Sequence, residues 1–173
     1  MKKLLIFTMP FILFGCSQNP LYEESEENTY TQNIYRKINV SYQDWTELKT
    51  RHNGNYSYER DTKIKEGFNT STKIVVENNR VESRSLFEWQ TGSTPSKSWH
   101  ENYAQLGLHQ EGAAPVTIDA LYDQCKTQVL NQAGSSALLK TDQLNILKQC
   151  SYTINQCVSN CTKGIRIQGL TLY

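Results

Sequence analysis

Trp99, His100, Glu101 and Tyr103 are the side chains whose types and spacing most suggest chemistry in this sequence. An imidazole beside a carboxylate can move a proton. Such a pair needs a positioned third partner, and a surface cluster that packs its own segment explains these residues more simply. They fall within residues 91–115, a long irregular segment of the kind that often makes contacts. We therefore predict a contact loop here rather than an active site.

Short motifs of common active sites are absent from the sequence. There is no Gly-x-Ser-x-Gly nucleophile elbow, no His-Glu-x-x-His zinc motif and no glycine-rich phosphate loop. Asp119 and Asp123 lie four residues apart, but a first-turn acid and a solvated neighbour explain this pair without acid–base chemistry. We predict no catalytic residue, no cofactor and a protein that is not an enzyme.

The first sixteen residues combine a basic start, an apolar run and a cysteine. The run, residues 4–14, is shorter than the about 20 residues that cross a bilayer, which favours a secretory signal over a membrane span. A plain signal would not need a cysteine after a small residue. Residues 13–16, Leu-Phe-Gly-Cys, resemble the lipobox of bacterial lipoproteins. The resemblance implies cleavage before Cys16, a diacylglyceryl group on its thiol and, because Ser17 follows, anchoring in the outer membrane facing the periplasm.

Charge is distributed unevenly after this signal. Residues 16–30 contain four glutamates and no basic residue, which predicts a lipidated cysteine followed by an acidic tether without regular structure. Residues 31–173 contain sixteen basic and thirteen acidic residues and are expected to form a single domain. This small positive balance predicts no large basic patch and argues against a nucleic-acid partner.

The four remaining cysteines are expected to form two disulfides, because an exported protein enters an oxidising compartment. They are Cys125, Cys150, Cys157 and Cys161. Three pairings exist, and we favour Cys157–Cys161, which closes a loop, with Cys125–Cys150, which fixes a helix to the final hairpin. The alternative is a metal site that adds His100 or His109. The cysteine spacing is wider than in zinc fingers and ribbons, so we predict no metal.

Helical periodicity predicts two main helices. The first covers residues 39–54, with Ser41 as N-cap and Asn53-Gly54 as the stop signal. The second follows Thr117 as N-cap and has one buried apolar stripe. That stripe comprises Ile118, Leu121, Tyr122, Cys125 and Val129. A further short helix is predicted from residue 141 through residue 147.

Strand patterns occur in two parts of the chain. Residues 56–64, 73–77 and 80–89 predict an antiparallel meander, with Asn78-Asn79 in a tight turn. Residues 152–154 and 165–172 predict a final hairpin around a cysteine-rich loop. The expected fold is α+β, with two main helices packed on a mostly antiparallel sheet of about five strands in cystatin-like order.

Several segments together resemble a family of small, uncharacterised bacterial envelope lipoproteins. The shared features are a helix with Trp45, the Asn-Tyr-Ser-Tyr run at residues 55–58, a β-branched strand and turn at residues 74–81, and Thr-Ile-Asp-Ala-Leu-Tyr-Asp at residues 117–123. The resemblance covers residues 41–172 apart from the middle loop. It departs after Tyr152, where a longer loop with two cysteines replaces the family's tight turn. It implies no catalytic residue.

These observations predict a lipid-anchored envelope lipoprotein that acts as a non-enzymatic binding module. Its expected partners are the membrane, through the lipid anchor, and an envelope protein or cell-wall component. Two alternatives stay open. One is an inhibitor of a periplasmic hydrolase that inserts the 157–161 loop or the 91–115 loop, and the other is an enzyme that uses residues 99–103.

Overall fold

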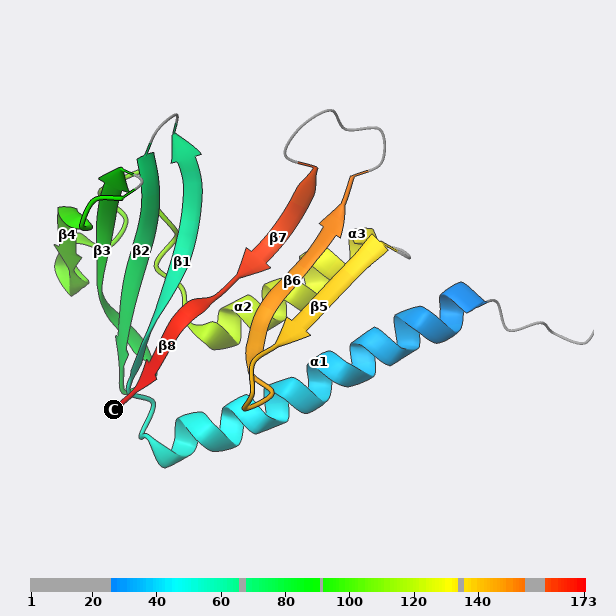
Figure 1. The fold of residues 1–173 in the computed structure, drawn as a ribbon. Coiled ribbons are helices and arrows are strands. Elements are labelled where there is room, and N and C mark those ends of the chain that lie inside the picture. The colour runs from blue at the N-terminus through cyan, green and yellow to red at the C-terminus, as the bar shows by residue number, and fades with distance from the viewer. Residues whose placement is uncertain (1–25, 66–67, 91, 134–135, 155–160) are drawn as a thin grey trace, which may run out of the picture.

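A computed structural model describes residues 26–65, 68–90, 92–133, 136–154 and 161–173. These residues form an α+β fold with two antiparallel sheets, one of five strands and one of three (Figure 1). We call them the large sheet and the small sheet. The predicted fold class is confirmed, but a second sheet was not predicted, and the cystatin-like order is not confirmed.

Helix α1 spans Glu26–Arg51 and is therefore longer than the predicted helix. Ile34, Ile38, Trp45 and Leu48 recur on one buried face, which explains why the helix begins before residue 39. The predicted tether is wrong for residues 26–30, which are helical. Glutamates in the first turn suit the positive end of the helix macrodipole.

Ser41 is not the predicted N-cap, because it lies in the middle of α1 and is fully buried. Its hydroxyl donates to the carbonyl oxygen of Asn145 at 2.6 Å and lies 2.7 Å from the Tyr122 hydroxyl. Tyr122 also accepts a hydrogen bond from the backbone N–H of Leu147 at 2.8 Å. This buried network fixes α1 to the second helix and to the turn at residues 142–146.

The large sheet has the strand order β4-β3-β2-β1-β8. Its strands are β1 (Tyr56–Lys65), β2 (Phe68–Glu77), β3 (Arg80–Gln90), β4 (Ser96–Asn102) and β8 (Gln168–Leu172). The predicted meander is confirmed, and Asn78 and Asn79 have φ angles of 50° and 63°, as a tight hairpin turn requires. The predicted 91–115 loop is wrong in part, because residues 96–102 form β4, which pairs with β3. A 3-10 turn, η1 (Tyr103–Gln105), follows the strand.

The second helical segment lies on one face of the small sheet. It comprises α2 (Ile118–Gln124), a π-helical turn η2 (Cys125–Val129) and α3 (Leu130–Ala133). Thr117 accepts a hydrogen bond from the backbone N–H of Ala120, and every residue of the predicted stripe is buried. Both predictions for this helix are confirmed.

The small sheet has the strand order β5-β6-β7, with β5 (Ala137–Thr141), β6 (Leu147–Thr153) and β7 (Thr162–Arg166). The short helix predicted from residue 141 is wrong, because the Asp142 carboxylate accepts the backbone N–H groups of Leu144 and Ile146 and closes a turn. The predicted final strand at 165–172 divides at Ile167, where the chain passes from the small sheet to the large one. The final hairpin itself is confirmed by the pairing of β6 with β7.

One cluster of buried apolar side chains joins both sheets and both helical segments. Trp45 of α1 meets Tyr56 of β1 edge to face, with ring centroids 4.8 Å apart. Ile167, at the crossing between the sheets, belongs to the same cluster. The two sheets therefore share one core. The face of each sheet that points away from this core is available for polar groups.

Candidate functional site

Glu101, a member of the predicted contact loop, is fully buried in the large sheet. Arg84 of β3 approaches its carboxylate with two nitrogens, Nε on Oε2 and Nη2 on Oε1, the latter at 3.0 Å. The backbone N–H groups of Gly107 and His109 donate to the same carboxylate at 2.9 and 2.6 Å. The predicted contact role is wrong for this residue, because its oxygens are occupied within the chain.

The charge on Glu101 is stabilised strongly. Hydrogen bonds from Arg84 hold the pKa of this carboxyl far below its ordinary value, against the opposing effect of burial. The backbone donors of His109 and Gly107 lower it further. Arg84 also donates to the carbonyl oxygen of Ala113 at 2.9 Å. The pair therefore fixes the segment after β4 to the edge of the large sheet.

The other three predicted contact residues do not converge with one another. Trp99 stacks on His109, with ring centroids 4.4 Å apart, and covers Arg84. His100 points to the other face of β4, where its Nδ1 lies 2.9 Å from the Ser85 hydroxyl. Tyr103 is exposed and lies under the Arg80 guanidinium. No shared surface of these residues is formed.

The predicted Cys125–Cys150 disulfide is confirmed, with Cα atoms 5.8 Å apart. It ties the π-helical turn η2 to the central strand of the small sheet. Cys157 lies outside the described residues, so its pairing with Cys161 stays a prediction. Cys16 also lies outside them, and so does its lipidation.

Asp119 occupies the first turn of α2 as predicted and binds α1. Its carboxylate accepts from Lys49 at 2.6 Å and from the Trp45 indole at 3.4 Å. Asp123 is exposed and does not share this site. Among the described residues, no group of three or more His, Cys, Asp and Glu side chains is placed to hold a metal ion.

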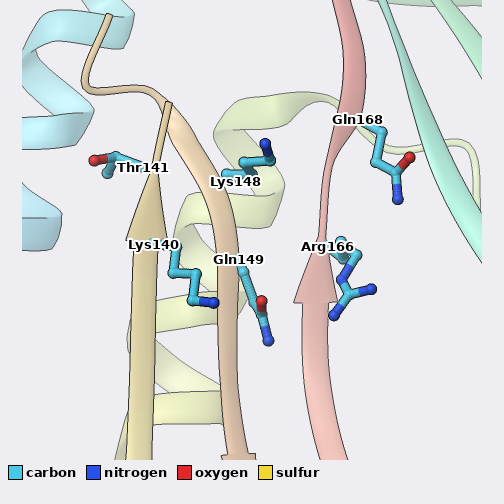
Figure 2. Close-up of a pocket in the computed structure, with 6 residues that line it drawn as sticks. All are labelled: Lys140, Thr141, Lys148, Gln149, Arg166 and Gln168. Carbon is cyan, nitrogen blue, oxygen red and sulfur yellow. The ribbon is translucent and has the colours of Figure 1, made fainter. Parts of the chain in front are cut away.

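The strongest candidate site lies on the small sheet, on the face opposite the helices. Cys150 and Ile165 face the helical segment, so the alternating residues Lys140, Gln149 and Arg166 face the other way. These three are direct cross-strand neighbours on β5, β6 and β7. Figure 2 shows them one after another across the three strands. The row therefore places one cation on each side of the Gln149 amide.

A hollow of about 350 Å³ lies over this row. We call it the basic pocket, and it is lined by Lys140, Thr141, Lys148, Gln149, Arg166 and Gln168 (Figure 2). Its volume is within the range of small-molecule sites, about 300–1,000 Å³. The lining holds three cations, two amides and one hydroxyl, and no acidic side chain.

A β-bulge brings Lys148 to the pocket. Lys140 pairs with Gln149, but the next residue, Thr141, pairs with Leu147, so β6 has one extra residue at position 148. Bulges redirect side chains from the face that simple alternation would give them. Alternation alone places Lys148 with Cys150 on the helix face. The bulge instead lets its side chain line the pocket beside Gln149.

The cations of the basic pocket are not neutralised by the described part of the chain. None of Lys140, Lys148 and Arg166 forms an ion pair with a described carboxylate, whereas Lys49, Arg80 and Arg84 each do. Gln149 is nearly buried, and its amide nitrogen donates to the Ser151 hydroxyl at 2.9 Å. The pocket therefore has a fixed polar floor and cationic walls with no carboxylate partner among the described residues, which suits an anion.

A second hollow shares Thr141 with the basic pocket and has two more cations in its lining. It lies between α1 and β5 and has a volume of about 460 Å³. Its lining comprises Arg36, Lys37, Val40, Leu139, Thr141 and Asn145. Two more cations therefore flank the basic pocket on the side of the helix.

Sequence reasoning missed the basic pocket, and the prediction of no large basic patch does not describe this surface. One signal was available: residues 137–173 contain four basic residues and one acidic residue, an excess that the average over the whole domain hides. Arg166 and Gln168 also alternate with apolar residues in the predicted last strand. The bulge at Lys148 has no signature in the sequence that we recognise.

The chain matches no protein-family model, no curated protein and no solved structure. The resemblance to small envelope lipoproteins stays a prediction. In the part of the chain that the structure describes, no helix is both long and apolar enough to cross a membrane.

Proposed function

We propose that this chain is a bacterial envelope lipoprotein, anchored through Cys16, that acts as a non-enzymatic binding module. The observation that best supports this proposal is the order of features in the first sixteen residues. Two lysines are followed by an apolar run too short to span a bilayer and then by Leu-Phe-Gly-Cys. Ser17 after the cysteine favours the outer membrane, with the domain facing the periplasm. Acyl chains contribute about 0.8 kcal/mol per buried CH₂, so several of them hold a protein on the membrane.

The basic pocket is the binding surface that we assign to this module. It gathers unpaired cations over a polar floor, whereas the buried carboxylate in the 99–103 region is already fully hydrogen-bonded. Neighbouring exposed apolar groups, Leu144 at the β5–β6 turn and Val40 on α1, add area for a larger partner. The fold then serves to present this face to a partner in the envelope.

Lipidation is tested by intact mass and membrane fractionation of the full chain expressed in a bacterial host. The native chain is expected to begin at Cys16 with acyl groups attached and to sediment with membranes. Cys16→Ser is expected to lose both, while the neighbouring Ser17→Ala keeps the acyl groups. A native chain without acyl groups would overturn the proposed anchor.

The binding role is tested by cross-linking in living cells. A photo-cross-linking amino acid at position 144, an exposed residue beside the basic pocket, is expected to capture a discrete envelope partner. The matched control is position 97, which is an exposed lysine on β4. Equal capture at the two positions, or no capture at either in correctly anchored protein, would contradict the assignment of the pocket as the binding surface.

A further inference from the structure

We infer that the basic pocket binds a phosphoryl group carried on a small, hydroxylated body. This inference rests on the proposed function, because it names the ligand chemistry of the same surface. The phosphate belongs either to a soluble sugar phosphate or to the headgroup of a lipid, which present the same chemistry to the pocket. Three features of the pocket support this inference: the number of its cations, their arrangement and the size of the hollow.

Three cations suit a phosphoryl group better than a carboxylate. Adjacent strands lie roughly 4.8 Å apart, so the backbones of Lys140 and Arg166 are about 10 Å apart across β6. Long side chains can reach one anion between them from both sides, and Lys148 adds a third donor along β6. A phosphate monoester offers three terminal oxygens and a charge of about −1.5 to −2, whereas a carboxylate offers two oxygens and one charge.

The donors differ in a way that fixes orientation. Arg166 offers a planar fork that binds two phosphate oxygens together, and the two lysines act as point charges. Gln149 is held in place by its hydrogen bond to Ser151, two residues further along β6. Because the described chain gives these cations no carboxylate partner, an anion that enters displaces no internal ion pair.

The remaining volume calls for more than a phosphate. A hollow of about 350 Å³ is larger than one phosphoryl group needs, and its other lining groups are the Thr141 hydroxyl and the amides of Gln149 and Gln168. Hydroxyls and amides both donate and accept hydrogen bonds, so they pair with sugar or polyol hydroxyls rather than with apolar groups. The hollow therefore suits a phosphorylated polyol.

The test uses full-length lipidated protein in phosphatidylcholine nanodiscs, titrated calorimetrically with glucose 1-phosphate. We expect saturable binding that weakens as salt is added, and little binding of glucose. Lys140→Gln, Lys148→Gln and Arg166→Gln are each expected to weaken binding about tenfold, since each removes a charge-assisted hydrogen bond. The matched control is Lys163→Gln. Lys163 is also an exposed residue of β7, but it lies on the opposite face of the small sheet from Arg166. Its affinity is expected to stay within about twofold.

The ligand source is resolved in the same preparation. If phosphatidic acid in the nanodisc competes with glucose 1-phosphate, the site takes a lipid headgroup; if it does not, the site takes a soluble phosphate, and either result supports the inference. No binding of glucose 1-phosphate, equal binding of glucose, or an equal loss in Lys163→Gln would overturn it. The intact mass of the same sample reports the acyl groups at Cys16. A failure of the predicted ligand binding is therefore distinguishable from a failure of the predicted lipidation.

Discussion

Arg84 of the large sheet and the pocket cations of the small sheet are held in opposite ways. The large sheet buries Arg84 against Glu101, surrounds both with hydrogen bonds and leaves neither charge for another molecule. The small sheet holds Lys140, Lys148 and Arg166 on its open face without a described carboxylate partner. Arginine is thus structural at position 84 of the large sheet and available at position 166 of the small sheet. The presence or absence of a partner decides which role a charged residue has.

The comparison also predicts where stability resides. A buried ion pair that loses one member leaves an uncompensated charge in the core, which costs several kcal/mol. An exposed cation without a partner contributes almost nothing to folding. Substitutions in the buried Arg84–Glu101 pair should therefore act on stability, and substitutions in the basic pocket should act on binding.

Glu101→Ala is the substitution with the largest expected effect. It leaves the Arg84 guanidinium buried and unpaired, and it frees the backbone N–H groups of Gly107 and His109. We expect a loss of about 3–5 kcal/mol in the free energy of unfolding, measured by urea titration. His100→Ala, the exposed neighbour on the same strand, should change it by less than about 0.5 kcal/mol. Similar losses in the two variants would break the comparison.

Removal of the Cys125–Cys150 disulfide has the next largest effect. In Cys125→Ala/Cys150→Ala we expect a loss of about 2–4 kcal/mol, because the bond closes a 25-residue separation in the unfolded chain. Cys125→Ala alone should lose a similar amount, because either change breaks the bond. The measurement is thermal unfolding without reductant. An unchanged midpoint would mean that this bond does not hold the small sheet to its helix.

Acid should destabilise the protein through Glu101. The folded-state pKa of Glu101 is below its unfolded value of roughly 4.3, so this carboxylate contributes fully above that pH. The contribution is lost as pH falls below about 4 and through the folded-state pKa. Glu101→Gln should lose less stability between neutral and acidic pH than the native chain. Parallel pH profiles for the two proteins would contradict the assigned role of the ion pair.

The smallest expected effect on folding is that of the basic pocket. Lys140→Gln/Lys148→Gln/Arg166→Gln removes three neighbouring like charges, so the free energy of unfolding should rise slightly or stay within about 0.5 kcal/mol at low salt. Binding of glucose 1-phosphate should be abolished in the same variant. A large loss of stability would show that these residues are structural and that the contrast between the sheets is wrong.

Local patterns explain what the sequence predicted well. The apolar residues of the 118–129 helix repeat within one helical segment. The turn between β2 and β3 is marked by two adjacent residues, Asn78 and Asn79. The Cys125–Cys150 pair follows from the few pairings that four cysteines allow. In each case the information lies within one segment or in a small number of alternatives.

What was missed depends on residues that are distant in sequence. Glu101 looked like a contact residue because its partner, Arg84, is seventeen positions away on another strand. Residues 141–147 were predicted to be a helix rather than a turn because the Asp142 carboxylate can accept backbone N–H groups in helix caps and in turns alike. The basic pocket needs three strands in register and a bulge at Lys148, and both depend on sheet pairing.

Residue-resolved NMR of the ¹⁵N-labelled protein, titrated with glucose 1-phosphate, tests the central claim most directly. The account predicts saturable shifts at the backbone amides of residues 140–141, 148–149 and 166–168, with the amides of β4 unchanged. Shifts centred on β4 and residues 103–113 instead, or no shift at all, would contradict the assignment of the small sheet as the binding face.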